Sequence, residues 1–167
     1  GAMEPGRLSS GIPDLDSTVG GLIPGDNIVW VTDHPNTLRF FEDAFLAAGV
    51  DQHRTCVYVD TDLERHGTPS LDSVIMQVDA RPGKKDSDLQ TLEEALVEIA
   101  RAHPRTFVVV DGLDALVHRW GPARVAAFYG RTCPRLFDLG AVAYWRVSPS
   151  AMGSSLDQIR RVAQCVF

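Results

Sequence analysis

Short apolar runs rich in β-branched residues alternate with helical patterns along almost the whole chain, and this alternation constrains the fold more than any other feature of the sequence. Strands are expected at residues 27–32, 55–60, 73–78, 106–110, 141–147 and 163–167. The run at 106–110 is apolar and ends at Asp111, as is typical of a strand buried on both faces of a parallel sheet. Strands that alternate with helices in this way predict a three-layer α/β fold with a mainly parallel central sheet.

The helix expected between the first two strands covers residues 37–48 and ends at Gly49, because glycine commonly terminates helices. Four apolar residues recur at helical spacing and form its buried face: Leu38, Phe41, Phe45 and Ala48. Phe40 has to point away from that face, so it is the residue available to fill a pocket beside the helix.

Two later helices carry their own start signals. Residues 87–90 (SDLQ) form a capping box that opens a helix, which stops before Pro104. Pro122 suits the first turn of the next helix. Gly130 and Pro134 are expected to break or kink that helix, because proline has no N–H to donate and its ring crowds the preceding turn.

The length of 167 residues suits a single domain with a sizeable core. Apolar residues make up 44% and charged residues 23%, and no apolar run approaches the roughly 18 residues of a membrane-spanning helix, so no membrane partner is expected. Residues 1–3 (GAM) are typical of a protease-cleavage scar, which leaves residues 4–167 as the domain. The last apolar run stops inside an expected strand, and this favours a fragment of a longer chain.

The spacing of cysteine and histidine argues against a metal site. The cysteines are odd in number, widely spaced and without a zinc pattern, which favours reduced thiols in a cytoplasmic protein; they are Cys56, Cys133 and Cys165. The 5 histidines form no HxxxH or HExxH pair. The sequence therefore predicts neither a bound metal nor a cofactor.

The net charge of −6 conceals two opposed halves. Residues 1–100 carry a net charge of −11, whereas residues 101–167 carry +5. An acidic chain without a Lys/Arg run does not favour binding to nucleic acid. The opposed halves would suit head-to-tail self-association, and the simpler alternative is that these charges pair within one fold or are solvated.

Four segments occur in an order that points to a known family. Residues 10–16 (SGIPDLD) and 20–26 (GGLIPGD) resemble the segment that leads into the phosphate-binding loop of RecA-type ATPases of the KaiC/RadA group. Residues 57–62 (VYVDTD) resemble the family's strand end that carries the catalytic glutamate, and residues 108–116 (VVVDGLDAL) resemble its Walker B strand. The resemblance covers nearly the whole chain and implies a RecA-like version of the three-layer fold.

The resemblance also marks where a phosphate-binding loop, GxxxxGK[ST], would stand. That position reads Asp33, His34, Pro35, Asn36, Thr37, Leu38, Arg39 and Phe40. Such a loop needs glycines for close backbone approach to phosphate, a lysine to neutralise it and a hydroxyl for magnesium. Asp33 and Leu38 replace the glycines, and a carboxylate 4 Å from a phosphate charge costs about 1 kcal/mol in water and about 4 at an effective dielectric of 20. The loop is therefore degenerate, and Arg39 is its one residue compatible with phosphate.

The other two positions of the family site are altered less. Asp111 stands at the Walker B position, but Phe40 offers no oxygen to complete a magnesium site with it. Asp62 stands at the position of the catalytic glutamate, and its side chain is one methylene shorter. For both aspartates the alternative is a structural role, ending a strand or capping a turn.

Three arginines of the second half, Arg131, Arg135 and Arg146, could reach a nucleotide on a neighbouring subunit in a RecA-like ring. Without a triphosphate to meet, they are better interpreted as surface charge or interface pairs.

Together these features predict a catalytically inactive RecA/KaiC-like domain, a pseudo-ATPase that serves protein association or regulation, with a protein partner or a weak homo-oligomer. A sensory domain of the MEDS type is one alternative, since residues 25–30 (GDNIVW) resemble its first strand; it would bind a small ligand in the vacated pocket. An ATPase with an unconventional loop that uses Arg39, Asp62 and Asp111 is the other. The state of the carboxyl edge of the sheet separates the three hypotheses. An open, apolar pocket there favours the sensory domain, and an open, polar pocket favours the nucleotide binder. A pocket filled by Arg39 or Phe40 favours the inactive domain.

Overall fold

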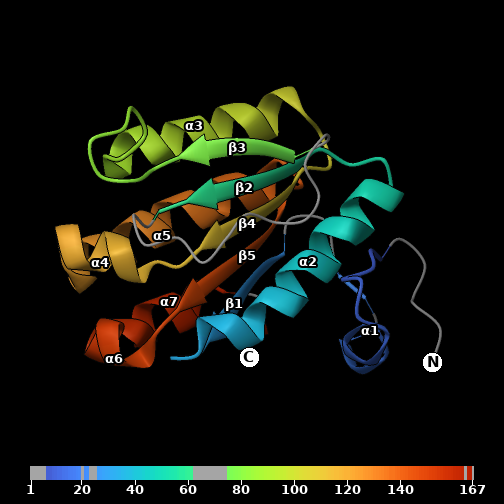
Figure 1. Cartoon of the computed structure of the whole chain (residues 1–167), viewed down its shortest axis with the longest axis horizontal. Coiled ribbons are helices and arrows are strands. Elements are labelled where there is room, and N and C mark those ends of the chain that lie inside the picture. Colours follow the sequence, from blue (N-terminus) through green and yellow to red (C-terminus); the bar gives the residue numbers. More distant parts are fainter. Residues whose placement is uncertain (1–6, 20, 23–25, 62–74, 164, 167) are drawn as a thin grey trace.

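The computed structural model describes residues 7–19, 21–22, 26–61, 75–163 and 165–166, and its centre is a six-stranded sheet of order β3-β2-β4-β5-β1-β6 (Figure 1). The strands are β1 (Asn27–Val31), β2 (Cys56–Asp60), β3 (Ile75–Asp79), β4 (Phe107–Asp111), β5 (Val142–Val147) and β6 (Cys165–Val166). Every pair of neighbouring strands is parallel. The predicted parallel α/β architecture is confirmed.

Helices cover both faces of this sheet and complete three layers. They are α1 (Pro13–Val19), α2 (Pro35–Asp51), α3 (Leu89–Ala102), α4 (Asp114–Trp120), α5 (Pro122–Asp138), α6 (Pro149–Met152) and α7 (Leu156–Val162), with a 3-10 turn η1 (Gly153–Ser155) before the last. Helix α2 crosses one face, whereas α3, α5 and α7 lie behind the sheet in Figure 1. No helix of the described ranges is both long enough and apolar enough to span a membrane.

The strands are apolar on both sides because each face of the sheet belongs to a different core. Val108 and Val110 of β4 pack with the helices behind the sheet. Phe107 and Val109, which alternate with them, pack with the residues under α2. This two-sided burial explains why the sequence shows continuous apolar runs rather than alternating ones.

Helix α2 continues through Gly49 to Asp51, so the prediction that Gly49 ends it was wrong. A Cβ atom at Gly49 would lie 2.6 Å from the Cys56 Sγ and 2.8 Å from the Phe107 ring. The glycine therefore allows the helix to approach the sheet closely, and it does not act as a terminator.

Helix α5 begins at Pro122 as predicted, but it is not broken at Gly130 or Pro134. Pro134 is exposed, while Cys133 and Leu136 beside it are fully buried. Packing of the buried face against the core holds the helix together where a local rule predicts a break.

Helix α3 begins at Leu89, one residue later than a capping box that starts at Ser87 predicts. Its N-cap is Asp88, whose carboxylate accepts hydrogen bonds from the backbone N–H groups of Gln90 and Thr91 at 2.9 and 3.4 Å. Cys56 and Cys133 are free and buried, in agreement with the expected reduced thiols, and burial raises the pKa of Cys56 to about 11.

Candidate functional site

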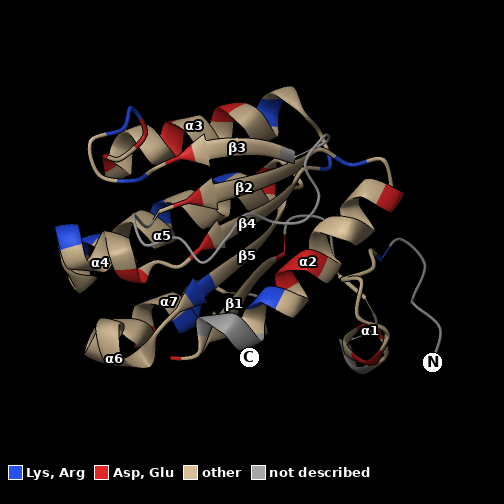
Figure 2. Cartoon of the chain, in the orientation of Figure 1, with Lys and Arg blue, Asp and Glu red and all other residues tan. Residues whose placement is uncertain are grey.

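The carboxyl edge of the sheet is where the chain leaves neighbouring strands toward opposite faces. Strand β1 leads into α2 on one face, and β4 and β5 lead into helices on the other face (Figure 1). In open α/β sheets, ligands bind in the crevice outside such a point of divergence. Acidic and basic residues gather at this edge, at the ends of β2, β4 and β5 and in the first turns of α2 (Figure 2).

The position of the expected phosphate loop is occupied by a tight turn. Only residues 32–34 separate β1 from α2, which begins at Pro35. Asp33 and His34 lie in this turn, whereas the six residues that follow, Pro35, Asn36, Thr37, Leu38, Arg39 and Phe40, are already helical. No open loop of eight residues is formed here by the described chain, because the helix starts too early.

The Asp33 carboxylate is held at the start of α2 by two hydroxyl groups. Its Oδ1 accepts hydrogen bonds from the Ser148 hydroxyl and from the Ser150 hydroxyl, the latter at 2.8 Å. These bonds hold the pKa of Asp33 below its ordinary value, so the side chain is ionised at neutral pH. The carboxylate therefore places negative charge beside the N-terminus of α2, where a phosphate would approach.

The last three residues of the expected loop point in different directions. Leu38 is a core residue, 2% exposed, and the positive charge of partly exposed Arg39 lies near Glu42 and Tyr58. Phe40 is 70% exposed, so the expectation that it fills the emptied pocket was wrong. Because Phe41 takes the place over Trp30, with ring centroids 5.0 Å apart, the Phe40 ring remains outside and meets Phe41 edge-on.

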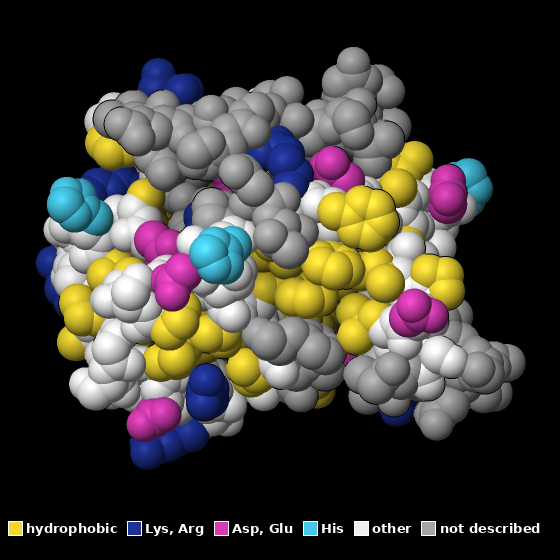
Figure 3. Space-filling view, turned by 60° about the horizontal axis from the view of Figure 1, so that its bottom comes forward, with side chains coloured by type: hydrophobic (Ala, Val, Ile, Leu, Met, Phe, Trp, Pro, Cys, Tyr) yellow, Lys and Arg dark blue, Asp and Glu magenta, His cyan; other side chains and the backbone are white. Residues whose placement is uncertain are grey.

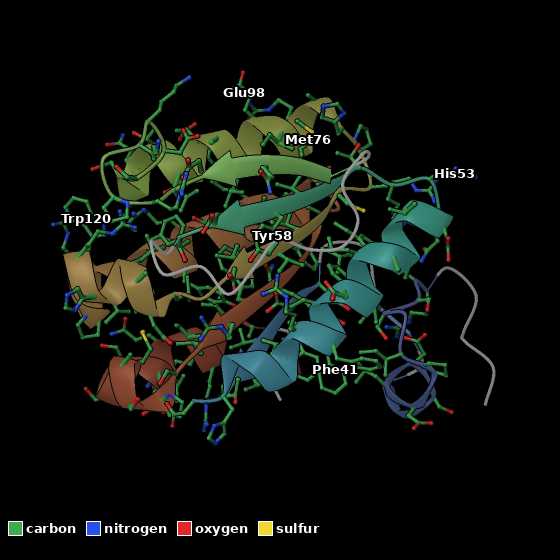
Figure 4. The ribbon with its side chains drawn as sticks, in the orientation of Figure 1. Phe41, His53, Tyr58, Met76, Glu98 and Trp120 are labelled. Carbon is green, nitrogen blue, oxygen red and sulfur yellow. The ribbon has the colours of Figure 1, made fainter. Side chains whose placement is uncertain are left out.

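Asp111 lies at the end of β4, as predicted, and its carboxylate is in contact with other side chains of the fold. Its Oδ2 accepts a hydrogen bond of 2.5 Å from the Tyr58 hydroxyl, and its Oδ1 lies 3.9 Å from the Arg146 Nε. Tyr58 comes from the middle of β2 and lies over the centre of the sheet (Figure 4). A guanidinium group therefore stands beside the carboxylate, where a metal ion would also be attracted.

Arg146 is a largely enclosed member of this site, so its interpretation as surface or interface charge was wrong. Its side chain is 11% exposed, and its Nη1 lies 3.1 Å from the Asp114 Oδ2. Gly112, with φ +83°, passes beneath the guanidinium, and a Cβ atom there would lie 2.0 Å from the Arg146 Nη2. The arginine can occupy this place only because residue 112 has no side chain.

Arg131 and Arg135, in contrast, pair within the chain. They lie 3.1 and 2.7 Å from the carboxylate of Glu93 on α3, and Arg135 also lies 2.9 Å from Glu94. Part of the opposed charge of the two halves is therefore neutralised across α3 and α5, as the simpler interpretation of the charge pattern predicts.

Glu42 belongs to the acidic first half, which was expected to supply it to a head-to-tail contact, but the structure buries it to 6% exposure. It takes part in no hydrogen bond within the described part of the chain. Burial and the neighbouring charge of Asp111 raise its pKa to about 8, although Arg146 and Arg39 act in the opposite direction. The sequence did contain a signal, since Glu42 falls at helical spacing between Leu38 and Phe45 on the buried face of α2.

The end of β2 is joined to the end of β4 by Thr61. Its hydroxyl lies 2.7 Å from the carbonyl oxygens of both Asp111 and Gly112 and donates a hydrogen bond to them. Asp62, at the expected position of the catalytic glutamate, lies outside the described residues. Within the described ranges, no group of three or more His, Cys, Asp or Glu side chains is placed to hold a metal ion.

A search of protein-family models and a search of curated proteins find no match to this chain.

Proposed function

We propose that this chain is a RecA/KaiC-like domain without nucleotide chemistry, and that it acts by association with a second copy of itself. The observation that carries the proposal is Asp33, an ionised carboxylate bound by Ser148 and Ser150 at the N-terminus of α2. A phosphate group brought to this helix end would meet like charge, and Pro35 in the first turn contributes no N–H to bind it.

The environment of Asp111 supports the same proposal. A magnesium ion coordinated by this carboxylate would lie close to the Arg146 guanidinium, which is 3.9 Å from the Asp111 Oδ1. Two unit positive charges 4 Å apart repel by about 4 kcal/mol at an effective dielectric of 20, and magnesium carries two such charges. The domain is therefore proposed not to be an enzyme, and its buried free thiols, Cys56 and Cys133, suit a cytoplasmic setting.

An aromatic ridge formed by Trp30, Phe41 and Phe40 supports association as the function. Its outermost ring, Phe40, is 70% exposed, and the rings beneath it are stacked and fixed. Hydrophobic side chains gather at the centre of the face shown in Figure 3, which includes the side of the molecule where α2 begins and β6 forms the edge of the sheet. Exposed aromatic residues on a rigid base are typical anchors of protein interfaces.

Sedimentation velocity over a concentration series tests the proposal. The wild-type chain is expected to show a sedimentation coefficient that rises with concentration. Phe40→Ser should abolish that rise, because it removes the exposed ring without touching the core. Phe137→Ser is the matched control, since Phe137 is also exposed (44%) but lies at the end of α5.

Two results would contradict the proposal. A wild-type chain that is monomeric at every concentration at roughly 50 mM salt, where screening is modest, excludes self-association. Equal loss of association in both phenylalanine variants would mean that the aromatic ridge is not the surface involved.

A further inference from the structure

A pocket of about 540 Å³ opens at the amino ends of the strands, at the edge of the sheet opposite to the carboxyl edge that carries Asp33 and Asp111. Its lining comes from the end of α2, the segment between α2 and β2, strand β3 and the residue after α3: Val50, His53, Arg54, Thr55, Met76 and His103. His53 and Met76 mark its two sides in Figure 4. Its volume is within the range of small-molecule sites.

Arg54 is the feature of this pocket that requires an explanation. The residue is only 7% exposed, and its guanidinium lies 5.1 Å from the centre of the Phe107 ring. It donates hydrogen bonds of 3.3 Å to the Gln52 side chain and to the Arg105 carbonyl oxygen. No carboxylate pairs with it anywhere in the described residues, although buried charged groups are normally paired because desolvation is costly.

Among the described residues, the charged group that acts on Arg54 is a second arginine. Burial and the charge of Arg105, whose carbonyl oxygen accepts a hydrogen bond from Arg54, both lower the pKa of Arg54. Two imidazole side chains, His53 and His103, line the same pocket. An anion bound here would offset the repulsion between the arginines and accept charge-assisted hydrogen bonds from the Arg54 guanidinium.

Two residues in contact with Arg54, its neighbour His53 and its hydrogen-bond acceptor Arg105, have positive φ. Among the described residues, the non-glycine positions with positive φ are His53 (φ 56°) and Arg105 (φ 72°). His53 is the second residue after α2. Its N–H donates to the Val50 carbonyl oxygen at 3.0 Å and the Arg54 N–H donates to the Gly49 carbonyl oxygen at 2.8 Å, a common way for a helix to end at a residue of positive φ. The end of α2 therefore fixes the backbone position of Arg54 relative to the helix.

We propose that this pocket binds a small organic phosphate. The phosphate group would lie against the Arg54 guanidinium, whose planar fork suits phosphate oxygens, with His53 and His103 at its sides. The organic part would contact Val50 and Met76, the apolar side chains of the lining. This site is separate from the aromatic ridge and does not depend on the proposed association.

The test is an NMR titration of the chain with inorganic phosphate and with phenyl phosphate at pH 7, against sodium chloride of equal ionic strength. We expect saturable shifts of the His53 and His103 resonances with both phosphates and none with chloride. Phenyl phosphate should bind roughly tenfold more tightly, because Val50 and Met76 contact its ring.

Substitutions in the pocket distinguish specific phosphate binding from nonspecific attraction of anions to positive charge. Arg54→Met is expected to abolish saturable binding. Arg54 also contacts Phe107 and Arg105, so His53→Asn and His103→Gln provide exposed changes that cannot unfold the core, and each should weaken binding severalfold. His118→Gln, an exposed histidine on α4, is the matched control and should leave binding unchanged.

Three results would overturn the proposal. The first is the absence of saturable shifts up to roughly 20 mM of either phosphate, which corresponds to no useful affinity. The second is an equal effect of His118→Gln and the pocket variants. The third is phenyl phosphate binding no more tightly than inorganic phosphate. That result would mean that Val50 and Met76 do not contact an organic group and that the ligand is not an organic phosphate.

Discussion

Glu42 is a buried carboxyl group whose protonation is linked to the stability of the fold. Its pKa of about 8 in the folded protein lies above its ordinary value of 4.5, because the carboxylate form is desolvated and lies near Asp111. Between these two pH values the folded protein retains a proton that the unfolded chain has released. The free energy of unfolding therefore falls as the pH rises from about 4.5 to about 8, and it levels off above that.

Glu42→Gln is expected to remove this fall, since glutamine stays neutral at every pH. The free energy of unfolding of the variant minus that of the wild type should therefore be larger at pH 8.5 than at pH 5, by up to about 4 kcal/mol. Urea unfolding at the two pH values measures the difference. Asp51→Asn, a change at the exposed last residue of α2, should leave the wild-type dependence in place, because Asp51 is not among the charges that act on Glu42. Parallel pH curves for Glu42→Gln and the wild type would show that Glu42 is ionised in the fold.

Gly112→Ala is predicted to destabilise the chain through Arg146. The substitution adds a Cβ atom 2.0 Å from the Arg146 Nη2 at a residue with φ +83°, so backbone strain and displacement of a buried guanidinium both act. We expect a loss of about 2–4 kcal/mol in the free energy of unfolding, measured by urea denaturation.

Gly83→Ala is the matched control for this prediction. Gly83 has φ +81° but no atom within 4 Å of the position of a Cβ, so only backbone strain of about 1 kcal/mol remains. Equal losses in the two variants would mean that the contact between residue 112 and Arg146 contributes nothing. Combining Gly112→Ala with Arg146→Ala should cost less than the sum of the two single changes, because the clash is absent.

At the scale of elements, Gly49 and Gly130 offer a comparison of two helical glycines. Gly49→Ala should lower the free energy of unfolding by about 1–3 kcal/mol, because the new methyl group would press on Cys56 and Phe107. Gly130→Ala should raise it by about 0.5–1 kcal/mol, since nothing lies within 4 Å of that position and alanine favours the helix. Thermal and urea unfolding check both changes. Stabilisation by Gly49→Ala would contradict the close approach of α2 to the sheet.

The same two helices show how far the elements can be predicted from sequence. The strands were predicted to within one or two residues, because buried β-branched runs are a local signal. The end of α2 was predicted wrongly at Gly49, and a break of α5 at Pro134, one of the two outcomes expected there, does not occur. In both cases the deciding interaction is packing against residues distant in the chain, which no local rule contains.

The site was predicted from the sequence only in part, for a related reason. Asp33 and Asp111 were selected because the family resemblance puts them at the phosphate-loop and Walker B positions, and the structure places both at the carboxyl edge. The contacts of Asp111 with Tyr58 and Arg146 depend on β4 lying between β2 and β5, and strand order is not encoded locally. The buried state of Glu42 likewise depends on which face of the sheet α2 covers.

At the scale of the whole molecule, the two edges of the sheet differ in charge. The carboxyl edge has ionised Asp33, and the buried guanidinium of Arg146 there is matched by Asp111 and Asp114. The amino edge has Arg54 with no carboxylate partner among the described residues. Binding of ATP and binding of a small organic phosphate can therefore be told apart. ATP would use the carboxyl edge in a RecA-like site, whereas the small phosphate is proposed to use Arg54 at the amino edge.

Magnesium-ATP is expected not to bind at the carboxyl edge at sub-millimolar concentration. The turn at residues 32–34 is short, Asp33 repels the triphosphate, and Arg146 competes with a metal ion for Asp111. Isothermal titration calorimetry with ATP and magnesium up to about 1 mM measures this. A saturable isotherm abolished by Arg39→Ala would contradict the proposed pseudo-ATPase and favour an unconventional nucleotide site. An isotherm that survives Arg39→Ala and is lost in Arg54→Met would instead assign the phosphate to the pocket at the amino edge, and the carboxyl edge would still bind no nucleotide.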